Sequence, residues 1–264
     1  MSIFAAIDGF SSPDSLGAFL RASQSRFGDK LAIASSLGAE DVILVRAAAE
    51  LARQGGAAIR IFILDTGRLP EATYELHEAL EARYGLRIES IFPDTVGVQT
   101  LVRGQGMNGF MHSLEARHRC CGVRKLEPLG RALEGVDAWI TGLRRAQSAS
   151  RTTVELAEQD GARVKLNPLA HWSDDEVWSH IRDNNIPYSA LHDRGYPSVG
   201  CEPCTRAVEP GAHPRSGRWW WEDPQHNECG LHVARIRRLK EARNADDTVV
   251  ERGAEAPSVR PNGA

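Results

Sequence analysis

The chain has 264 residues, of which 42% are hydrophobic and 25% are charged, a balance that is ordinary for a globular protein. A chain of this length buries roughly 70% or more of its unfolded surface and needs no disulfides for stability. The formal net charge of −3 excludes a uniformly basic nucleic-acid binder. No apolar run approaches the roughly 18 residues needed to span a bilayer. We therefore expect a protein that acts without nucleic acid or a membrane.

The chain begins MSIFAAIDGFSS and lacks the basic segment and long apolar stretch of a secretory signal. We therefore expect a reducing, cytoplasmic environment. The chain contains five cysteines. In such an environment five cysteines favour metal ligation or catalysis over disulfides.

Apolar segments alternate with helical patterns along the first half of the chain. We expect strands within 31–41, 57–67 and 86–94, helices over 42–56 and 69–85, a further strand within 136–145, and a helix over 173–185. Ser173 is the expected N-cap of the last helix, and Glu176 completes a capping box. This order predicts an open, mostly parallel α/β sheet with helices on both faces.

The loop SSLGAED, residues 35–41, follows the first expected strand. Open α/β sheets bind ligands outside the carboxyl ends of their strands. Gly38 would permit close approach of a phosphate to the start of the next helix, and Ser35 or Ser36 would offer hydroxyls. The alternative is a simple helix cap with an acidic first turn.

Two further loops follow strand ends and should converge on the same crevice. In LDTGRLPEAT, residues 64–73, Leu64 and Thr66 could offer backbone groups to a base and ribose, or Asp65 and Thr66 could merely cap a helix. In TGLRRAQSASR, residues 141–151, three arginines and a serine form a possible phosphate clamp, because guanidinium groups match phosphate oxygens. The alternative there is an exposed basic loop. The clamp residues are Arg144, Arg145, Ser148 and Arg151.

Four of the cysteines form two close pairs, Cys120 with Cys121 and Cys201 with Cys204. Adjacent cysteines fit a single tetrahedral zinc ion poorly, whereas a cubane cluster accepts one thiolate at each iron. The pattern therefore favours a 4Fe-4S cluster over zinc or over unligated buried cysteines. Lys125 lies one helical turn after Cys121 and could direct its ammonium toward the cluster or an anionic ligand.

Five motifs together resemble one enzyme family. They are CCGVRKLEPL (120–129), TGLRRAQS (141–148), GCEPCTR (200–206), GRWWWE (217–222) and ECGLH (228–232). In order and spacing, from about residue 30 to 240, the chain resembles the assimilatory adenylyl-sulfate and phosphoadenylyl-sulfate reductases. The resemblance implies an adenine nucleotide alpha hydrolase-like fold and one 4Fe-4S cluster on the paired cysteines. The paired cysteines look like the version that uses adenosine 5'-phosphosulfate (APS), and the alternative substrate is the 3'-phosphorylated form, PAPS.

The resemblance also implies a role for the fifth cysteine, Cys229. Its thiolate would attack the sulfur of the sulfate group, release AMP and form an S-sulfocysteine. Thioredoxin or a similar dithiol protein would then free sulfite, a step in sulfate assimilation toward cysteine. Arg215, Arg218 and His232 would supply the cationic neighbourhood that favours the thiolate. We also expect the enzyme to form a homo-oligomer.

The remaining site residues are carried over by motif position. Ser35, Gly38, Glu40 and Asp41 match the family's modified pyrophosphate-binding loop, although SSLGAED lacks the paired glycines and final serine of the related ATP pyrophosphatases. Leu64, Thr66 and Gly142 match the positions at which the family binds the adenosine. The residues that match or adjoin the family's phosphosulfate-binding positions are Lys125, Arg144, Arg145, Arg215, Arg218 and His232.

The expected organisation has three parts: a nucleotide-binding reductase core over 1–206, a mobile catalytic segment over 207–240 and a disordered tail over 241–264. The tryptophans of GRWWWE are expected to pack the catalytic segment and not to stack on adenine. Two other functions are compatible with the fold. One is an iron-sulfur sensor that binds nucleotide without turnover, and the other is an ATP-dependent thiolation enzyme, which SSLGAED and ECGLH disfavour.

Overall fold

The computed structural model describes residues 15–148 and 151–223. The chain divides into two units, Met1–Asn227 and Glu228–Ala264, and all described residues belong to the first. Cys229, His232 and the tail expected over 241–264 therefore lie outside the described residues. The boundaries expected at 206 and 240 stay predictions.

The first unit is built on a six-stranded sheet with the order β3-β2-β1-β4-β6-β5. Its strands are β1 (Leu31–Ser35), β2 (Arg60–Leu64), β3 (Ile88–Ile91), β4 (Ala138–Ile140), β5 (Ala157–Asp160) and β6 (Arg163–Leu166). All neighbouring strands pair in parallel except β5, which pairs antiparallel with β6 at one edge. At the centre of the sheet, Ile33 stands beside Ile61 on one side and Ile140 on the other. The expected mostly parallel sheet is confirmed.

Helices connect and cover these strands. The α-helices are α2 (Leu16–Phe27), α3 (Ala39–Arg53), α4 (Glu71–Tyr84), α5 (Thr95–Gln105), α6 (Leu114–Cys121), α7 (Glu127–Ala132) and α8 (Asp174–Asp183). Short helical turns are η2 (Gly28–Lys30), η3 (Gly109–Met111), η4 (Gly122–Leu126), η5 (Arg145–Gln147), η7 (His192–Arg194) and η8 (Glu202–Cys204). The capping box of α8 is confirmed, since the Ser173 side chain accepts from the backbone of Glu176 and the Glu176 carboxylate accepts from the backbone of Ser173.

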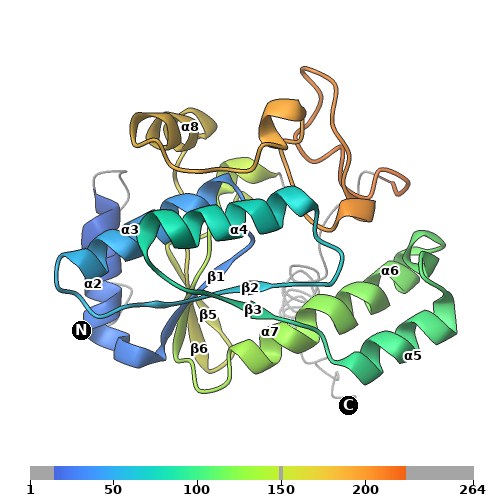
Figure 1. The fold of residues 1–264 in the computed structure, drawn as a ribbon, viewed down its shortest axis with the longest axis horizontal. Coiled ribbons are helices and arrows are strands. Elements are labelled where there is room, and N and C mark those ends of the chain that lie inside the picture. The colour runs from blue at the N-terminus through green and yellow to red at the C-terminus, as the bar shows by residue number, and fades with distance from the viewer. Residues whose placement is uncertain (1–14, 149–150, 224–264) are drawn as a thin grey trace, which may run out of the picture. The chain divides into compact units, whose positions relative to one another are not determined.

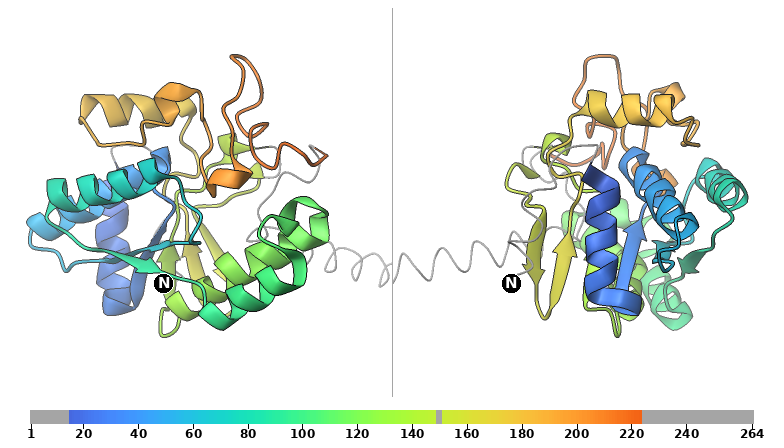
Figure 2. Two further views of the ribbon diagram at one scale, coloured as in Figure 1. Left: turned by 45° about the vertical axis from the view of Figure 1, so that its right-hand side comes forward. Right: turned by 90° about the vertical axis from the view of Figure 1, so that its left-hand side faces the viewer.

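Period-2 alternation along the strands divides the core between two faces of the sheet. Leu31 and Ile33 point to the larger core, which α2, α3, α4 and α8 cover. Ala32 and Phe62 point to the opposite face, where residues of α7 and the turn after it cover them. Figures 1 and 2 show α3 and α4 on one side of the strands and α7 on the other. The expectation of helices on both faces is therefore confirmed, although the two cores differ in size.

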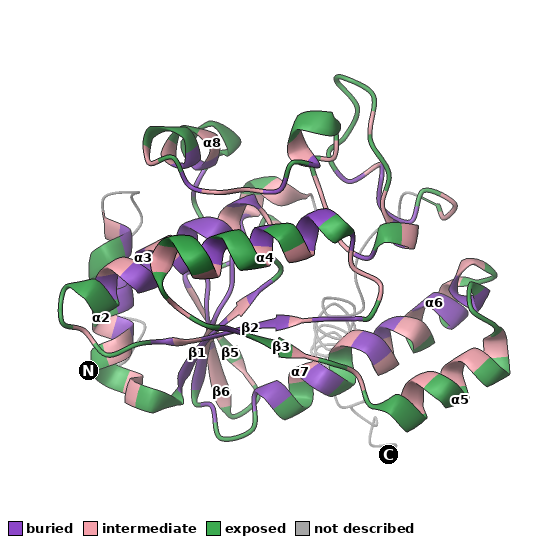
Figure 3. Ribbon diagram, in the orientation of Figure 1, coloured by how far each residue is buried: buried purple, intermediate pink, exposed green. Residues whose placement is uncertain are grey.

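Burial is greatest at the centre of the sheet and along α3, as Figure 3 shows. Helix α5 has no buried residue, whereas α3 is buried along most of its length. Within residues 15–148 and 151–223, none of the helices combines the length and the apolar character that crossing a bilayer would require.

Candidate functional site

The loop between β1 and α3 lies at the carboxyl edge of the sheet. Strand β1 ends at Ser35, and Gly38 is the N-cap of α3. Leu37, between them, adopts a left-handed backbone with φ of +56°, and its N–H donates to the Ser35 hydroxyl at 3.0 Å. The loop is therefore held in a tight turn by its own side chain. Because parallel strands end at one edge, the loops after β2 and β4 lie at the same edge.

Asp41 ties the loop after β1 to the loop after β4. Its buried carboxylate accepts from the Ser36 hydroxyl at 2.7 Å and from the backbone N–H groups of Ser36 and Gly142. A Cβ on Gly142 would lie 2.3 Å from a carboxylate oxygen, so only glycine permits this approach. Burial raises the pKa of Asp41 from 3.8 to about 6, although these hydrogen bonds oppose the rise. Asp41 and Gly142 thus contact each other, and their predicted contacts with substrate stay predictions.

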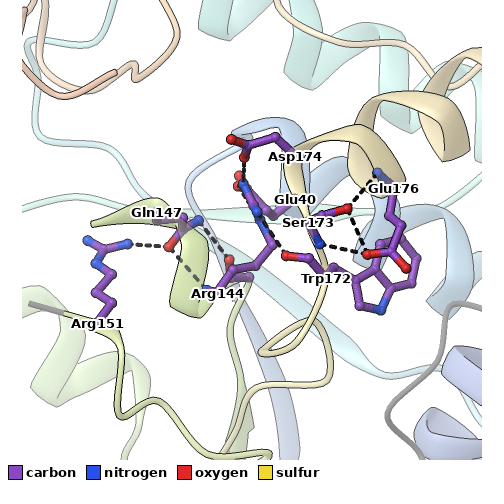
Figure 4. A network of polar contacts seen from close by, with 9 residues as sticks. Glu40, Arg144, Gln147, Arg151, Trp172, Ser173, Asp174 and Glu176 are labelled. Carbon is purple, nitrogen blue, oxygen red and sulfur yellow. Dashed lines mark hydrogen bonds and ion pairs between the residues drawn. The ribbon is translucent and has the colours of Figure 1, made fainter. Parts of the chain in front are cut away.

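Arg144 lies at the centre of the polar network in Figure 4. Its buried guanidinium bonds the carboxylates of Glu40 at 2.7 Å and Asp174 at 2.5 Å, and it donates to the carbonyl of Trp172 at 3.0 Å. Burial alone would lower the pKa of Arg144, but the charges and hydrogen bonds of the two acids raise it. This network joins the start of α3 to the start of α8. The phosphate contact predicted for Arg144 and Glu40 stays a prediction, and here both side chains are engaged with each other.

The rest of the basic loop is also bonded to protein groups. Arg145 donates to the carbonyl of Val154 at 2.7 Å and pairs with Glu155 at 2.9 Å. Arg151 donates to the side chain of Gln147, as Figure 4 shows. The carbonyl of Ser148 accepts from the backbone of Arg151. The structure therefore shows these residues shaping the loop, and their role as a phosphate clamp stays a prediction.

Thr66 joins the loop after β2 to both cysteine segments. It is buried, and its hydroxyl lies 3.2 Å from the sulfur of Cys201. Its carbonyl accepts from Arg124, which follows the Cys120 pair by a few residues, at 2.6 Å. Leu64, at the end of β2, packs against the smaller core. The adenosine contacts predicted for Leu64 and Thr66 stay predictions, while the link between Thr66 and the cysteines is new.

The cysteine pairs lie at the ends of short helical segments. Cys120 and Cys121 end α6 and lead directly into η4, a single π-helical turn of the kind often found at functional sites. Cys201 immediately precedes the turn η8, and Cys204 is its last residue. Cys120 is half-buried, and the other three are buried. Among the described residues no group of three or more acidic, histidine or cysteine side chains is placed to hold a single metal ion.

The electrostatics of these thiols show that the pairs are close enough to affect each other. Burial raises the pKa of Cys120, the charge of Cys201 raises it further, and nearby cations oppose this. Burial also raises the pKa of Cys204 to about 12, with the charges of Cys201 and Cys120 adding to the rise. The opposing cations are Arg68, Arg124, Lys125 and Arg218. Cys120, Cys201 and Cys204 therefore lie within electrostatic reach of one another and of these four cations, a setting that fits a bound group of net negative charge.

Arg218 and Arg215 lie beside the second cysteine pair. Arg218 is buried and donates to the carbonyl of Cys204 at 3.3 Å. It passes so close to Gly200 that a Cβ there would lie 2.2 Å from a guanidinium nitrogen. Arg215 is also buried and stacks over the ring of Trp219. The structure therefore brings Lys125 and Arg218 close to the cysteines. The motifs pointed only Lys125 toward them, and the contacts predicted for Arg215 and Arg218 with the substrate and with Cys229 stay predictions.

Sequence reasoning missed four charged residues that support this region. Arg68 donates from its side chain to the carbonyl of Met107, Arg124 donates to the carbonyl of Thr66, and Arg117 pairs with Glu222 in a buried ion pair at 2.7 Å. One signal was available, because Arg117 precedes Cys121 by four residues and so shares its helical face. The partners of the other three come from distant segments, which periodicity does not reveal.

Comparisons with known proteins agree with this arrangement. The family described as "Phosphoadenosine phosphosulfate reductase domain" matches residues 30–207. A protein of Allochromatium vinosum named adenosine 5'-phosphosulfate reductase is 52% identical over 206 residues, which are 77% of this chain and 79% of the relative. A relative with the same name from Sinorhizobium fredii (strain NBRC 101917 / NGR234) is 50% identical over 202 residues, 76% of this chain and 79% of the relative.

A solved structure shows the same fold. The crystal structure of phosphoadenylyl-sulfate reductase from Candida auris, in complex with phosphate, superposes with a TM-score of 0.63 at 22% identity. It covers 79% of this chain and 98% of that chain. With the family match extending over most of the described core, the chain belongs to the phosphoadenosine phosphosulfate reductase family.

Proposed function

We propose that this chain is an adenylyl-sulfate reductase, which reduces APS to sulfite and AMP in sulfate assimilation. The observation that carries the proposal is the meeting of both cysteine pairs with Lys125 and Arg218, in a chain whose relatives at about half identity bear this name. The cysteine and cation arrangement and the names of the relatives are independent observations that support the same activity. The charges suit a small anionic substrate that carries a phosphate and a sulfate.

The proposal includes one 4Fe-4S cluster on the four paired cysteines. Its support is the donor set of four thiols, their mutual electrostatic effect and the surrounding cations. When bound, the cluster would supply a charged centre to Lys125 and Arg218, the cations proposed to bind the substrate. Of the chain's own residues, Thr66 contacts Cys201, and Lys125 and Arg218 lie near Cys204, from where they are proposed to bind the anionic substrate.

Cys229 is the proposed nucleophile. Its thiolate attacks the sulfate sulfur, a sulfur–sulfur bond forms, the bond from that sulfur to the phosphate oxygen breaks, and AMP leaves. A dithiol protein such as thioredoxin then supplies two electrons: one of its thiolates displaces sulfite from Cys229, and its second thiol resolves the resulting mixed disulfide. Arg215, Arg218 and His232 are the proposed cationic partners of the thiolate and of the phosphosulfate.

The remaining residues take the roles that their positions support. Ser35 and Gly38 shape the turn that faces the phosphate, and the loops at Leu64, Thr66 and Gly142 frame the adenosine. Glu40, Asp41 and Arg144 fix these loops relative to one another through the contacts described above. The loop residues Arg145, Ser148 and Arg151 are proposed to close over the phosphate.

Mass spectrometry tests the covalent step. Anaerobic protein incubated with APS should gain about 80 Da, the mass of a sulfonate, on the peptide that contains Cys229, and thioredoxin should remove it. The control is Cys229→Ser, which should keep its iron but form neither adduct nor sulfite. Sulfite production by Cys229→Ser, or consumed APS beside an unmodified peptide, would refute the proposal.

PAPS is the second candidate substrate, and the family description favours it by name. The two differ by a 3'-phosphate on the ribose. Measured with both substrates, kcat/KM decides between them: a higher value for APS supports the proposal, and a higher value for PAPS replaces it.

A further inference from the structure

Trp219 is the centre of an unusual cluster of cations. Its ring is almost fully buried, and three arginine guanidinium groups lie over it: Arg117 at 4.4 Å, Arg218 at 4.9 Å and Arg215 at 5.8 Å from the ring centroid. Its backbone has φ of +44°, in the left-handed region that a bulky residue rarely adopts. A strained backbone persists only where its surroundings hold it, so the position of this ring is closely fixed.

Arg117 connects the ring to the first cysteine pair. It lies on α6, and Cys121 follows it by one helical turn on the same face. Its side chain is 1% exposed and pairs with the 8% exposed side chain of Glu222 at 2.7 Å. A buried arginine is costly unless it is paired and hydrogen-bonded. Glu222 and the Trp219 ring meet that need, and both come from the segment that follows the second cysteine pair.

The other end of the cluster is bonded to the second cysteine pair. The backbone N–H of Trp219 donates to the carbonyl of Cys204 at 3.2 Å, and Arg218 donates to the same carbonyl. An isolated β-bridge joins Thr205 to Arg218. The segment that carries Arg215 and Arg218 is therefore hydrogen-bonded to the backbone of Cys204, and the contacts of Arg117 also bind it to α6.

We propose that Arg117, Trp219 and Glu222 form a clamp that positions the two cysteine pairs relative to each other and orients Arg215 and Arg218 toward the substrate. The three are positioning residues, because they act through the cysteines and the two arginines. The part that concerns the substrate rests on the proposed function. The part that concerns the cysteines requires only that they hold iron.

The test compares two arginines of the same helix. Arg117→Met removes the buried charge, and the matched control Arg119→Met removes an exposed one, since Arg119 is 60% exposed and only pairs with Glu115 on the surface. Anaerobically purified proteins are compared by iron per chain, absorbance near 400 nm, KM for APS and kcat. We expect Arg117→Met to lose at least half of its iron and to raise KM about tenfold, the size expected from losing cation–π contacts, with a smaller change in kcat. Arg119→Met should match the wild type.

A conservative series keeps the test informative if Arg117→Met folds poorly. Arg117→Lys keeps the charge but loses the planar guanidinium, and Trp219→Phe keeps an aromatic ring. Both should fall between wild type and Arg117→Met in iron content and in KM, whereas a purely structural role would change thermal stability without this order. Native iron content together with native KM in Arg117→Met would overturn the clamp.

The outcomes separate the clamp from the proposed function. If the wild type holds iron but forms no sulfite, the proposed function fails, and the iron content of Arg117→Met still decides the clamp. If the wild type reduces APS while Arg117→Met keeps both iron and KM, the clamp fails and the function stands. If the wild type is active but holds no iron, the part of the proposal that concerns the cysteines fails. The KM of Arg117→Met then decides the part that concerns Arg215 and Arg218.

Discussion

Asp41 shows how a residue can matter to a site without touching its ligand. Its carboxylate joins the loops after β1 and β4 by accepting from Ser36 and Gly142. Both loops belong to the edge where the substrate is proposed to bind. Burial disfavours the charged carboxylate, and the adjacent negative charge of Glu40 adds to that effect. The contact between the two loops therefore depends on an acid whose pKa, about 6, lies close to neutral pH.

This acid should make stability depend on pH in a definite direction. The pKa of Asp41 is about 6 in the folded protein, against 3.8 for the ordinary side chain. Between these values the folded state binds more protons than the unfolded state, so the free energy of unfolding falls as pH rises. Urea titrations measure the free energy of unfolding of the wild type and of Asp41→Asn. The amount by which the wild-type value exceeds that of the variant should fall by about 1 kcal/mol between pH 5 and pH 7. A difference in free energy of unfolding that stays constant or grows over this range would contradict the raised pKa of Asp41.

Sequence reasoning placed Asp41 and Gly142 at the site but could not show that they contact each other. The motif gave each a position beside the ligand, one in the first loop and one in the third. The contact depends on the parallel pairing of β1 with β4, which brings the two loops so close that a Cβ on Gly142 would lie 2.3 Å from the Asp41 carboxylate. Local patterns carry no information on such a distance. The same holds for Thr66 and Cys201.

At the scale of elements, Arg144 attaches α8 to the start of α3. It is buried and bonds an acid from each helix, Glu40 and Asp174. Its neighbour Arg145 is a third exposed, and its acidic partner Glu155 is more exposed still. The two arginines are adjacent in the sequence, yet only the first holds two helices together. This difference in burial sets the expected cost of removing each.

The two arginines can therefore be compared directly. Arg144→Met should lower the free energy of unfolding by about 3 kcal/mol, because it removes a buried guanidinium and leaves the mostly buried carboxylate of Glu40 without its partner. Arg145→Met should cost less than about 1 kcal/mol, as exposed ion pairs do. Urea unfolding of both variants measures this. Equal losses would show that Arg144 is not the tie between α3 and α8.

Elements with strong periodicity were predictable, and those without it were not. The strands β1 and β2 and helices α3 and α4 follow their apolar patterns closely, and α8 begins at its predicted cap. Helix α5 was missed because TVGVQTLVRGQ is rich in β-branched residues and glycine, which favour helix weakly. The hairpin β5–β6 was missed because AEQD is polar and lacks a strand signal.

At the scale of the whole molecule, the cysteine pairs connect segments that lie far apart in the chain. Cys120 and Cys121 end α6, whereas Cys201 precedes η8 and Cys204 ends it. The proposed cluster would cross-link these segments in the folded state alone. A metal group bound only by the folded state adds its binding free energy to stability.

Removing the cluster should therefore lower the melting temperature. We expect anaerobically prepared, iron-depleted protein to melt about 5–10 °C below the iron-loaded protein, a shift equal to a few kcal/mol for a chain of this size. Calorimetry or circular dichroism measures the shift, and Cys229→Ser should show the same one because the fifth cysteine is not a proposed ligand. Equal melting temperatures for both forms would argue against cysteine ligation across the two segments.

Both margins of the sheet carry acidic side chains. Glu89 stands in β3 at one margin, and Glu158 and Asp160 stand in β5 at the other. Unpaired strand margins are templates for aggregation, and charges placed on them oppose the addition of a further strand. Copies of this protein are thus discouraged from joining edge to edge into a continuous sheet. Among the residues that the structure describes, helices and loops are therefore better suited than the strand edges to contacts between copies.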